Sequence, residues 1–195
     1  KHDPACYLCP GNTRANGLSN PDYKSTHTFI NDFSSLIDNI PEFSIQESDL
    51  LIARSEPGIC KVVCFSPQHD LTLAEMTIQE LENVVKAWRD EYKNLGALPY
   101  INHVQIFENK GEIMGCSNPH PHGQIWAQET IPGEPKKEQE CQLSYYNANR
   151  TSLLVDYLHL ELEKKERIIY ENEAFVVLVP FWAIWPYETM FLPKR

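Results

Sequence analysis

The nine residues from Cys116 to Gln124, which read Cys-Ser-Asn-Pro-His-Pro-His-Gly-Gln, constrain this chain more than any other stretch of its sequence. They place His120 and His122 two residues apart, with a proline before each and a glycine after the second. A residue that precedes proline is restricted toward extended backbone, and alternate residues of an extended segment point the same way. Gly123 lets the backbone or a ligand come close. An extended, histidine-bearing segment is therefore expected here.

A histidine in this setting suits phosphate chemistry. Neutral imidazole is a good nucleophile near pH 7, and a ring held through one nitrogen by a neighbouring acceptor can attack phosphorus through the other. Two other interpretations stay open for an isolated His-x-His pair. The histidines could be packed or surface residues of a proline-rich loop, or they could be a metal-ligand pair on a strand.

The chain resembles a known family over nearly its whole length. Six separated stretches carry the resemblance, in the order in which they occur: residues 6–12, 31–33, 65–69, 107–111, 114–126 and 180–189. They resemble the galactose-1-phosphate uridylyltransferases, a branch of the histidine-triad superfamily. The resemblance implies an α+β fold with a histidine-triad-like antiparallel sheet and flanking helices. It also implies that residues 1–195 form one N-terminal catalytic domain, truncated at both ends, of an enzyme built from two similar halves.

Composition limits the class of protein. A chain of 195 residues can bury one sizeable core or at most two small ones. Its net charge of -10 argues against nucleic acid or an anionic membrane as the main partner, while a small phosphate ligand needs only a local cluster of donors. Without a long apolar run or a signal-peptide pattern, the expected location is the cytoplasm, with the six cysteines reduced.

Hydrophobic periodicity predicts alternating strands and helices, which is typical of the α+β class. The prediction for residues 77–95 is a helix, because the apolar positions follow helical spacing and Thr77 and Glu80 form a capping-box pattern. A second helix is expected over residues 151–165. Loops are expected over residues 1–25 and 132–140, and the second of these could instead be the start of a helix. Strands are expected over residues 59–65, 103–107 and 124–127, and a hairpin is expected from 168–170 and 174–179.

The pair Cys6 and Cys9 has three interpretations when taken alone: a redox pair, a disulfide hairpin or half of a zinc site. Pro10 disfavours the following helix that a redox pair needs. The resemblance implies that His69 and His120 complete the set. Because a Cys2His2 shell leaves no open coordination position, the implied zinc is structural.

The resemblance then leaves His122 as the nucleophile that attacks the α-phosphorus of UDP-glucose. Glucose 1-phosphate leaves, and galactose 1-phosphate takes the uridylyl group from His122 to give UDP-galactose. Such a double displacement predicts ping-pong kinetics. Ser117 and Gln124 are the implied donors to the phosphoryl oxygens. Histidine-triad hydrolases generally carry a third histidine where this chain has Gln124, so the glutamine favours a transferase.

The substrate-binding positions are also implied by the resemblance. Taken alone, residues 31–32 and 109–111 look like ordinary turns. In the family pattern they belong to a set that holds the nucleotide: Leu8, Ala15, Asn31, Asp32 and Phe33 toward the nucleoside, and Asn109, Gly115, Cys116, Ser117 and Gln124 toward the phosphates. Glu138 matches a carboxylate that some relatives use for a second metal, which is left unassigned. Block 180–189 is expected to serve packing.

Two alternatives remain open at the level of function. One is a related histidine-triad nucleotidyltransferase or phosphorylase that acts on another nucleoside diphosphate sugar. The other is a zinc-stapled interaction module without enzyme activity. If the first interpretation holds, the family implies a homodimer in which residues of the partner complete the site.

Overall fold

The computed structural model describes residues 2–116 and 118–195, which form two compact units. The first unit ends at Ile131, and the second runs from Pro132 to Arg195. Antiparallel sheets and helices occur in both, so the predicted α+β class is confirmed. The single domain expected over residues 1–195 stays a prediction, because a division into compact units does not measure independent folding.

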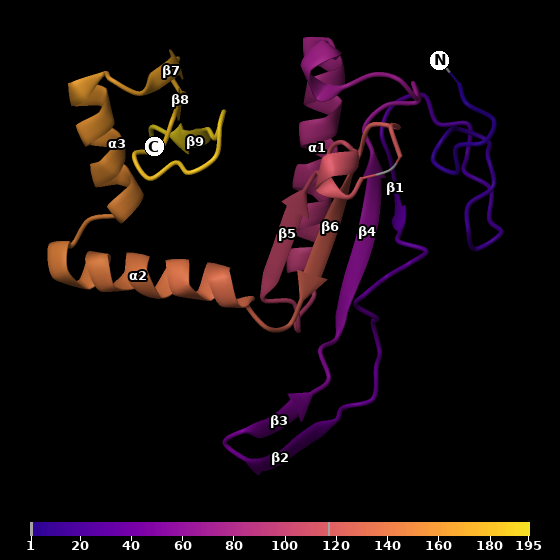
Figure 1. Cartoon of the computed structure of the whole chain (residues 1–195), viewed down its shortest axis with the longest axis horizontal. Coiled ribbons are helices and arrows are strands. Elements are labelled where there is room, and N and C mark those ends of the chain that lie inside the picture. The colour runs from indigo at the N-terminus through magenta and orange to yellow at the C-terminus, as the bar shows by residue number, and fades with distance from the viewer. Residues whose placement is uncertain (1, 117) are drawn as a thin grey trace. The chain divides into compact units, whose positions relative to one another are not determined.

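The first unit is built on a four-stranded antiparallel sheet in the order β1-β4-β6-β5 (Figure 1). The central pair is β4 (Gly58–Cys64) and β6 (His122–Gln128), whose register runs from Gly58 opposite Gln128 to Cys64 opposite His122. The outer strands are β1 (His27–Ile30) and β5 (His103–Phe107). The strand predicted over 124–127 therefore begins two residues earlier, at His122.

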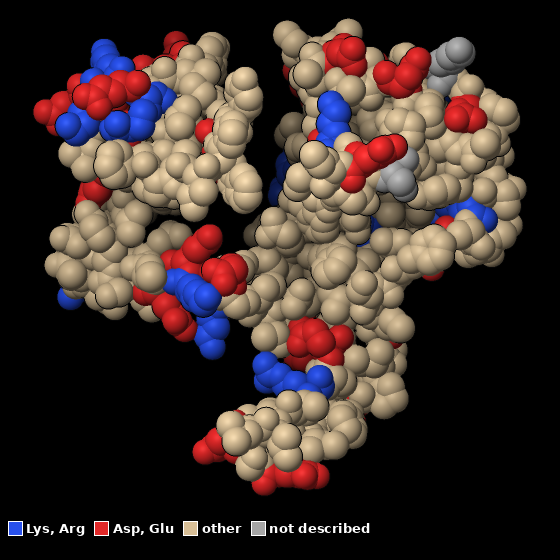
Figure 2. Space-filling view, viewed as in Figure 1, with Lys and Arg blue, Asp and Glu red and all other residues tan. Residues whose placement is uncertain are grey.

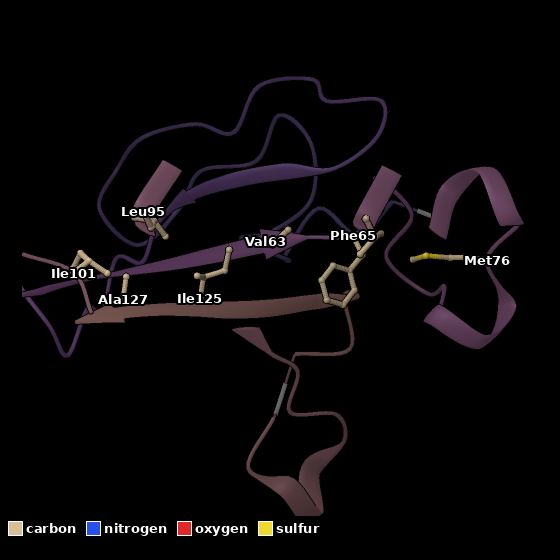
Figure 3. Packing of buried hydrophobic residues seen from close by; sticks show 8 residues of the cluster. Val63, Phe65, Met76, Leu95, Ile101, Ile125 and Ala127 are labelled. Carbon is tan, nitrogen blue, oxygen red and sulfur yellow. The ribbon is translucent and has the colours of Figure 1, made fainter. Parts of the chain in front are cut away.

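Helix α1 (Ile78–Gly96) packs on one face of this sheet. Thr77 caps it as predicted, because its hydroxyl accepts from the Glu80 backbone N–H and its own N–H donates to the Glu80 carboxylate at 2.8 Å. Figure 3 shows Val63 of β4 and Ile125 and Ala127 of β6 among the residues of this cluster. The buried members are Val63, Phe65, Met76, Val84, Leu95, Ile101, Ile125 and Ala127.

The N-terminal segment covers the other face of β4. Strand residues Val62 and Cys64 form a second buried cluster there with Cys6, Leu8, Cys9 and Tyr23. Successive side chains of a strand point to opposite faces, so β4 contributes Val63 to one cluster and its two neighbours to the other. The segment predicted as a loop is thus irregular but packed, because β4 needs a cover on both faces.

Four further short elements belong to the first unit. Strands β2 (Ser44–Ser48) and β3 (Leu51–Arg54) form a separate hairpin in which every residue is exposed, and Figure 1 shows it extending away from the sheet. Two single turns of 3-10 helix span Leu73–Glu75 and Glu112–Met114. None of these was predicted, because segments of three to five residues are too short to establish a hydrophobic period.

The second unit contains α2 (Gly133–Asn149), α3 (Leu153–Lys164) and a three-stranded sheet. Strands β7 (Ile168–Glu171), β8 (Phe175–Leu178) and β9 (Met190–Pro193) pair in that order, which confirms the predicted hairpin and adds β9. A small core joins α3 to the sheet through Leu158, Val176, Leu178 and Leu192. The polar segment expected over 132–140 is the start of a helix that continues to Asn149.

The aromatic block 180–189 packs only in part, because the Trp182 ring lies 4.7 Å from that of Tyr157 and Arg167 lies over the Phe181 ring. Phe181, Ile184, Trp185 and Tyr187 are all exposed. Between Pro180 and Pro186 the backbone turns instead of continuing β8, and Glu188 accepts hydrogen bonds from the backbone N–H groups of Ile184 and Trp185. The side chains therefore project from a turn instead of lining a sheet face.

Charged side chains of both signs are interspersed on the face drawn in Figure 2. Within the residues that the structure describes, no helix is long and apolar enough to cross a membrane.

The packing predicts the effect of shortening Ile125, which is fully buried in β6. Ile125→Ala removes apolar contacts with α1 and leaves a cavity, so we expect a loss of about 3 kcal/mol in the free energy of unfolding, measured by urea denaturation. Ile52→Ala, on the exposed β3, is the matched control and should cost under about 1 kcal/mol. Equal losses for the two variants would contradict this core assignment.

Candidate functional site

Four of the predicted side chains form one cluster. The ligand atoms of Cys6, Cys9, His69 and His120 all lie within 4.8 Å of one another, which is close enough to hold a metal ion. Cys9 Sγ lies 3.6 Å from His69 Nδ1 and 3.5 Å from His120 Nδ1. The cysteines come from the packed N-terminal segment, His69 follows β4, and His120 precedes β6. The cluster therefore ties three distant parts of the first unit together.

His120 is prepared to act as a ligand. Its Nε2 lies 2.9 Å from the Ser66 carbonyl oxygen, which can only accept, so Nε2 carries the proton and Nδ1 presents its lone pair toward Cys9. Tyr23 Oη lies 3.1 Å from the same Nε2. Burial lowers the pKa of His120 to about 4, which keeps the ring neutral near pH 7. A neutral imidazole with one nitrogen fixed is the form that binds metal.

The neighbours of the other ligands also suit a cation. The Asp3 carboxylate lies 3.6 Å from His69 Nε2, on the side of the ring opposite Cys9, as in carboxylate–histidine–metal arrangements. The Asn118 amide lies 3.6 Å from Cys6 Sγ. Burial raises the pKa of Cys9, so a cation is needed to hold this thiol as the thiolate. The donor set and its surroundings therefore fit a tetrahedral metal site.

His122 is held by the backbone next to this cluster. Its Nδ1 lies 2.7 Å from the His120 carbonyl oxygen. Because a carbonyl oxygen only accepts, Nδ1 must donate the proton, and Nε2 keeps a free lone pair. The half-buried ring begins β6 and is part of the sheet through the pairing with Cys64. His122 thus has the tautomer and the fixed orientation that a nucleophile requires.

Three cavities meet at His122. One of about 140 Å³ is lined by predicted phosphate contacts, namely Asn109, Gly115, Cys116 and Gln124, together with Tyr7, Asn118 and Gly123. A second of about 200 Å³ is lined by Leu8, Asn31, Asp32 and Phe33, together with Tyr7, Phe29, Val62 and Gln124. A third of about 490 Å³ adds side chains that include Asp70, Glu108 and Lys110. The predicted positions for phosphate and nucleoside thus lie on separate cavities that share His122.

Gln124 and Gly123 shape the wall beside His122. Gln124 follows His122 by two residues on β6, and its Oε1 accepts from Trp126 Nε1 at 3.2 Å, which leaves the amide N–H groups as donors. A Cβ at Gly123 would lie 2.8 Å from both the Phe107 carbonyl oxygen and Phe65 Cζ. Glycine is therefore required where β6 passes closest to β5.

The structure does not test one predicted residue, and it places Ala15 and Glu138 apart from this constellation. Ser117 lies outside the described residues, so its implied role as a phosphoryl donor stays a prediction. Ala15 is exposed and does not line the cavities at His122. Glu138 is exposed on α2, and among residues 2–116 and 118–195 it joins no group of metal-binding side chains.

Sequence reasoning missed several residues that support the site. Asp3, Tyr23, Ser66 and Asn118 contact the metal-binding side chains, as described above. Arg14 pairs with Asp32, with 3.4 Å between Nη1 and Oδ1. These contacts join residues distant in sequence, and only Asn118, within the histidine motif itself, could have been found from its spacing.

An antiparallel sheet that presents a fixed histidine beside a Cys2His2 cluster is a histidine-triad-like arrangement. Family models make the assignment specific. Residues 1–132 match the N-terminal domain of galactose-1-phosphate uridyl transferase, and residues 136–195 match its C-terminal domain. The chain belongs to the galactose-1-phosphate uridylyltransferase family.

Individual relatives agree with the family. The chain is 48% identical over 193 residues to a galactose-1-phosphate uridylyltransferase of Haemophilus influenzae. That match covers 99% of this chain and 55% of the relative. The chain is 46% identical over 196 residues to the Rattus norvegicus enzyme, covering 100% of this chain and 51% of that protein. The chain thus spans about half the length of the curated relatives it matches.

Solved structures share the fold. A uridylyltransferase structure matches all of this chain with a TM-score of 0.82 at 25% identity, and the match covers 60% of that chain. An ADP-glucose phosphorylase from Arabidopsis thaliana, solved with bound ADP-glucose, matches with a TM-score of 0.76 at 21% identity, over 100% of this chain and 61% of that one. At that identity the second match bears on the fold alone.

Proposed function

We propose that the full-length protein containing this chain exchanges a uridylyl group between UDP-glucose and galactose 1-phosphate. The observation that carries the proposal is the 2.7 Å contact from His122 Nδ1 to the His120 carbonyl oxygen, which leaves Nε2 free at the junction of the cavities. Membership of the galactose-1-phosphate uridylyltransferase family supports the choice of substrates.

The reaction has two displacements at the α-phosphorus. In the first, His122 Nε2 forms a bond to phosphorus while the bond to the bridging oxygen breaks, and glucose 1-phosphate leaves with that electron pair. In the second, a phosphate oxygen of galactose 1-phosphate attacks, the phosphorus–nitrogen bond breaks and its electron pair returns to Nε2. The first half-reaction leaves a positive charge on the ring, whose Nδ1 keeps its proton, and the second removes it. The products are UDP-galactose and neutral His122.

The residues on the two smaller cavities have distinct roles in this proposal. Asn109, Gln124 and the backbone at 115–117 donate to the phosphoryl oxygens, with the Ser117 hydroxyl among them. Asn31 and Asp32 bind the nucleoside between the apolar side chains of Leu8 and Phe33, and Ala15 contributes an outer contact. The Gln124 amide donates but cannot transfer protons near neutral pH, which favours transfer to a sugar phosphate over hydrolysis.

The metal of the Cys2His2 cluster is proposed to be structural zinc. A set of two sulfur and two nitrogen donors suits tetrahedral Zn²⁺ and leaves no open position. When bound, zinc supplies folding energy and neutralises the thiolates. The ligand His120 also supplies the carbonyl that orients His122, so the metal site acts on the reaction through the position of that backbone.

Family membership also supports a homodimer as the assembly. The cytoplasm is the proposed location, because all six cysteines are free thiols and such thiols persist in a reducing compartment.

The covalent step predicts loss of labelling in His122→Gln. Incubation of the full-length protein with UDP-glucose labelled in the α-phosphate should leave label on the wild type and none on the variant, because an amide cannot form the phosphoramidate. His159→Gln, on the exposed surface of α3, is the control and should label normally. Undiminished labelling of His122→Gln would contradict the assignment of His122 as the nucleophile. Replacing UDP-glucose by ADP-glucose in the same assay tests the choice of base.

The metal site predicts about one zinc per chain in the purified protein. Cys9→Ser should reduce the zinc content and lower the thermal midpoint, because the closed site contributes to folding. Cys141→Ser removes an exposed thiol on α2 and should change neither quantity. The two measurements are metal analysis and thermal denaturation. Identical metal content and midpoint in Cys9→Ser and wild type would show that the cluster is not the site.

The role of Gln124 predicts the fate of the uridylyl group. In the wild type it should persist in water and transfer mainly to galactose 1-phosphate. Gln124→His supplies a titratable ring beside the phosphorus and should raise the ratio of UMP release to transfer. Gln105→His, exposed on β5, is the matched control. An unchanged ratio in Gln124→His, or rapid UMP release by the wild type, contradicts this role.

A further inference from the structure

Arg14 and Asp32 form a buried ion pair at the edge of the second cavity. Their side chains are 10% and 6% exposed, and Nη1 lies 3.4 Å from Oδ1. Asp32 lines the cavity of about 200 Å³ that also reaches His122 and Gln124. A buried charge is costly unless it is fully paired, so the surroundings of this pair decide what it does.

The pair is held in place from two sides. The guanidinium of Arg14 lies over the Phe29 ring, with Cζ 4.1 Å from the ring centroid. The backbone of Arg14 is fixed in a turn, because its N–H donates to the Leu18 carbonyl and its carbonyl accepts from Gly17. Asp32 follows β1 directly after Asn31, whose N–H donates to the Cys60 carbonyl. The ring contact and the backbone hydrogen bonds therefore favour the position of Arg14 beside Asp32.

The pair is nevertheless incompletely hydrogen-bonded. Among the residues that the structure describes, no partner accepts from Arg14 Nε or Nη1, and none donates to Asp32 Oδ1. A pair at 3.4 Å without good hydrogen bonds contributes little to stability after desolvation. Arg14 therefore places a positive charge beside the Asp32 carboxylate. The carboxylate keeps its capacity to accept hydrogen bonds from another group.

This arrangement matches one part of a nucleotide. A carboxylate is an acceptor only, so it can bind hydroxyl or N–H donors and repels phosphates. With Arg14 beside it, the carboxylate is compensated and does not repel an anionic diphosphate. A ribose hydroxyl is a donor that a carboxylate oxygen can accept. A site built to bind a hydroxyl rejects an analogue that lacks it.

We infer that Arg14 is a positioning residue that holds Asp32 as a compensated, oriented acceptor for the ribose hydroxyls, and thereby sets the preference for ribonucleotides over 2′-deoxyribonucleotides. The inference rests on the proposed function for the placement of a nucleoside in this cavity. Arg14 is assigned a positioning role because Asp32 lines this cavity and Arg14 is not among its lining residues.

The test measures nucleotide binding apart from catalysis, using the full-length protein and calorimetric dissociation constants for UMP and 2′-deoxy-UMP. The wild type should prefer UMP by about 10- to 100-fold, which corresponds to a hydrogen bond to a charged acceptor. Arg14→Met should weaken UMP binding and reduce the preference to within about threefold, whereas Arg14→Lys should retain part of it. Arg89→Met is the matched control, because Arg89 is exposed on α1 and pairs with its neighbour Asp90.

A double variant separates positioning from a structural role. Asp32→Asn should itself remove most of the preference, and adding Arg14→Met to it should change the ratio of the two dissociation constants no further. The double variant removes both charges and so leaves no unpaired buried charge. Its two dissociation constants can therefore still be measured if Arg14→Met alone unfolds. Equal weakening of UMP and 2′-deoxy-UMP by Arg14→Met or Arg14→Lys, with the ratio kept, overturns the inference.

The outcome is distinguishable from failure of the proposed function. If the wild type discriminates between the nucleotides as expected and never transfers a uridylyl group, the reaction is wrong and the role of Arg14 stands. If the wild type transfers the group and its Arg14 variants keep the full preference for UMP, the role of Arg14 is wrong and the reaction stands.

Discussion

The site depends on one hydrogen bond, from His122 Nδ1 to the carbonyl oxygen of His120, over 2.7 Å. This contact joins the two functions of the histidine motif within three residues. The His120 side chain belongs to the metal-binding cluster, while its backbone carbonyl fixes the tautomer and direction of the His122 ring. A shift of His120 would therefore displace the His122 ring directly, because the acceptor carbonyl belongs to His120 itself.

The rest of the first unit keeps that carbonyl in place. Strands β4 and β6 carry the motif at the end of their ladder, α1 packs on one face, and the N-terminal segment packs on the other. Cys6 and Cys9 lie in that segment, so a bound metal closes the cover over β4. Gly123 lets β6 approach the Phe107 carbonyl without a clash. His122 and Gln124 lie two residues apart on β6 and therefore on the same face of the sheet. The packed core and the candidate site therefore share the end of the β4–β6 ladder at His122.

Sequence alone predicted the elements with strong local signals and the residues with a family pattern. Thr77 and Glu80 marked the start of α1, and β5 was predicted with its observed bounds. Helix α2 was missed beyond residue 140 because it lacks an apolar stripe, and β1, β2, β3 and β9 were missed because they are short. Cys6, Cys9, His69 and His120 were grouped through resemblance, which spacing could not have achieved over more than a hundred residues. Arg14, Asp3 and Tyr23 reach the site through long-range contacts that leave no local pattern.

The central claim is that, without bound substrate, the His122 ring carries its proton on Nδ1 and its lone pair on Nε2. Proton–nitrogen correlation spectra of the full-length protein with labelled histidine report this state directly, with the His122 signals assigned by their loss in a His122 variant. We predict a single tautomer near pH 7, with a protonated Nδ1 and an unprotonated Nε2. A proton on Nε2, or rapid exchange between both tautomers, would contradict the claim that the His120 carbonyl fixes the nucleophile.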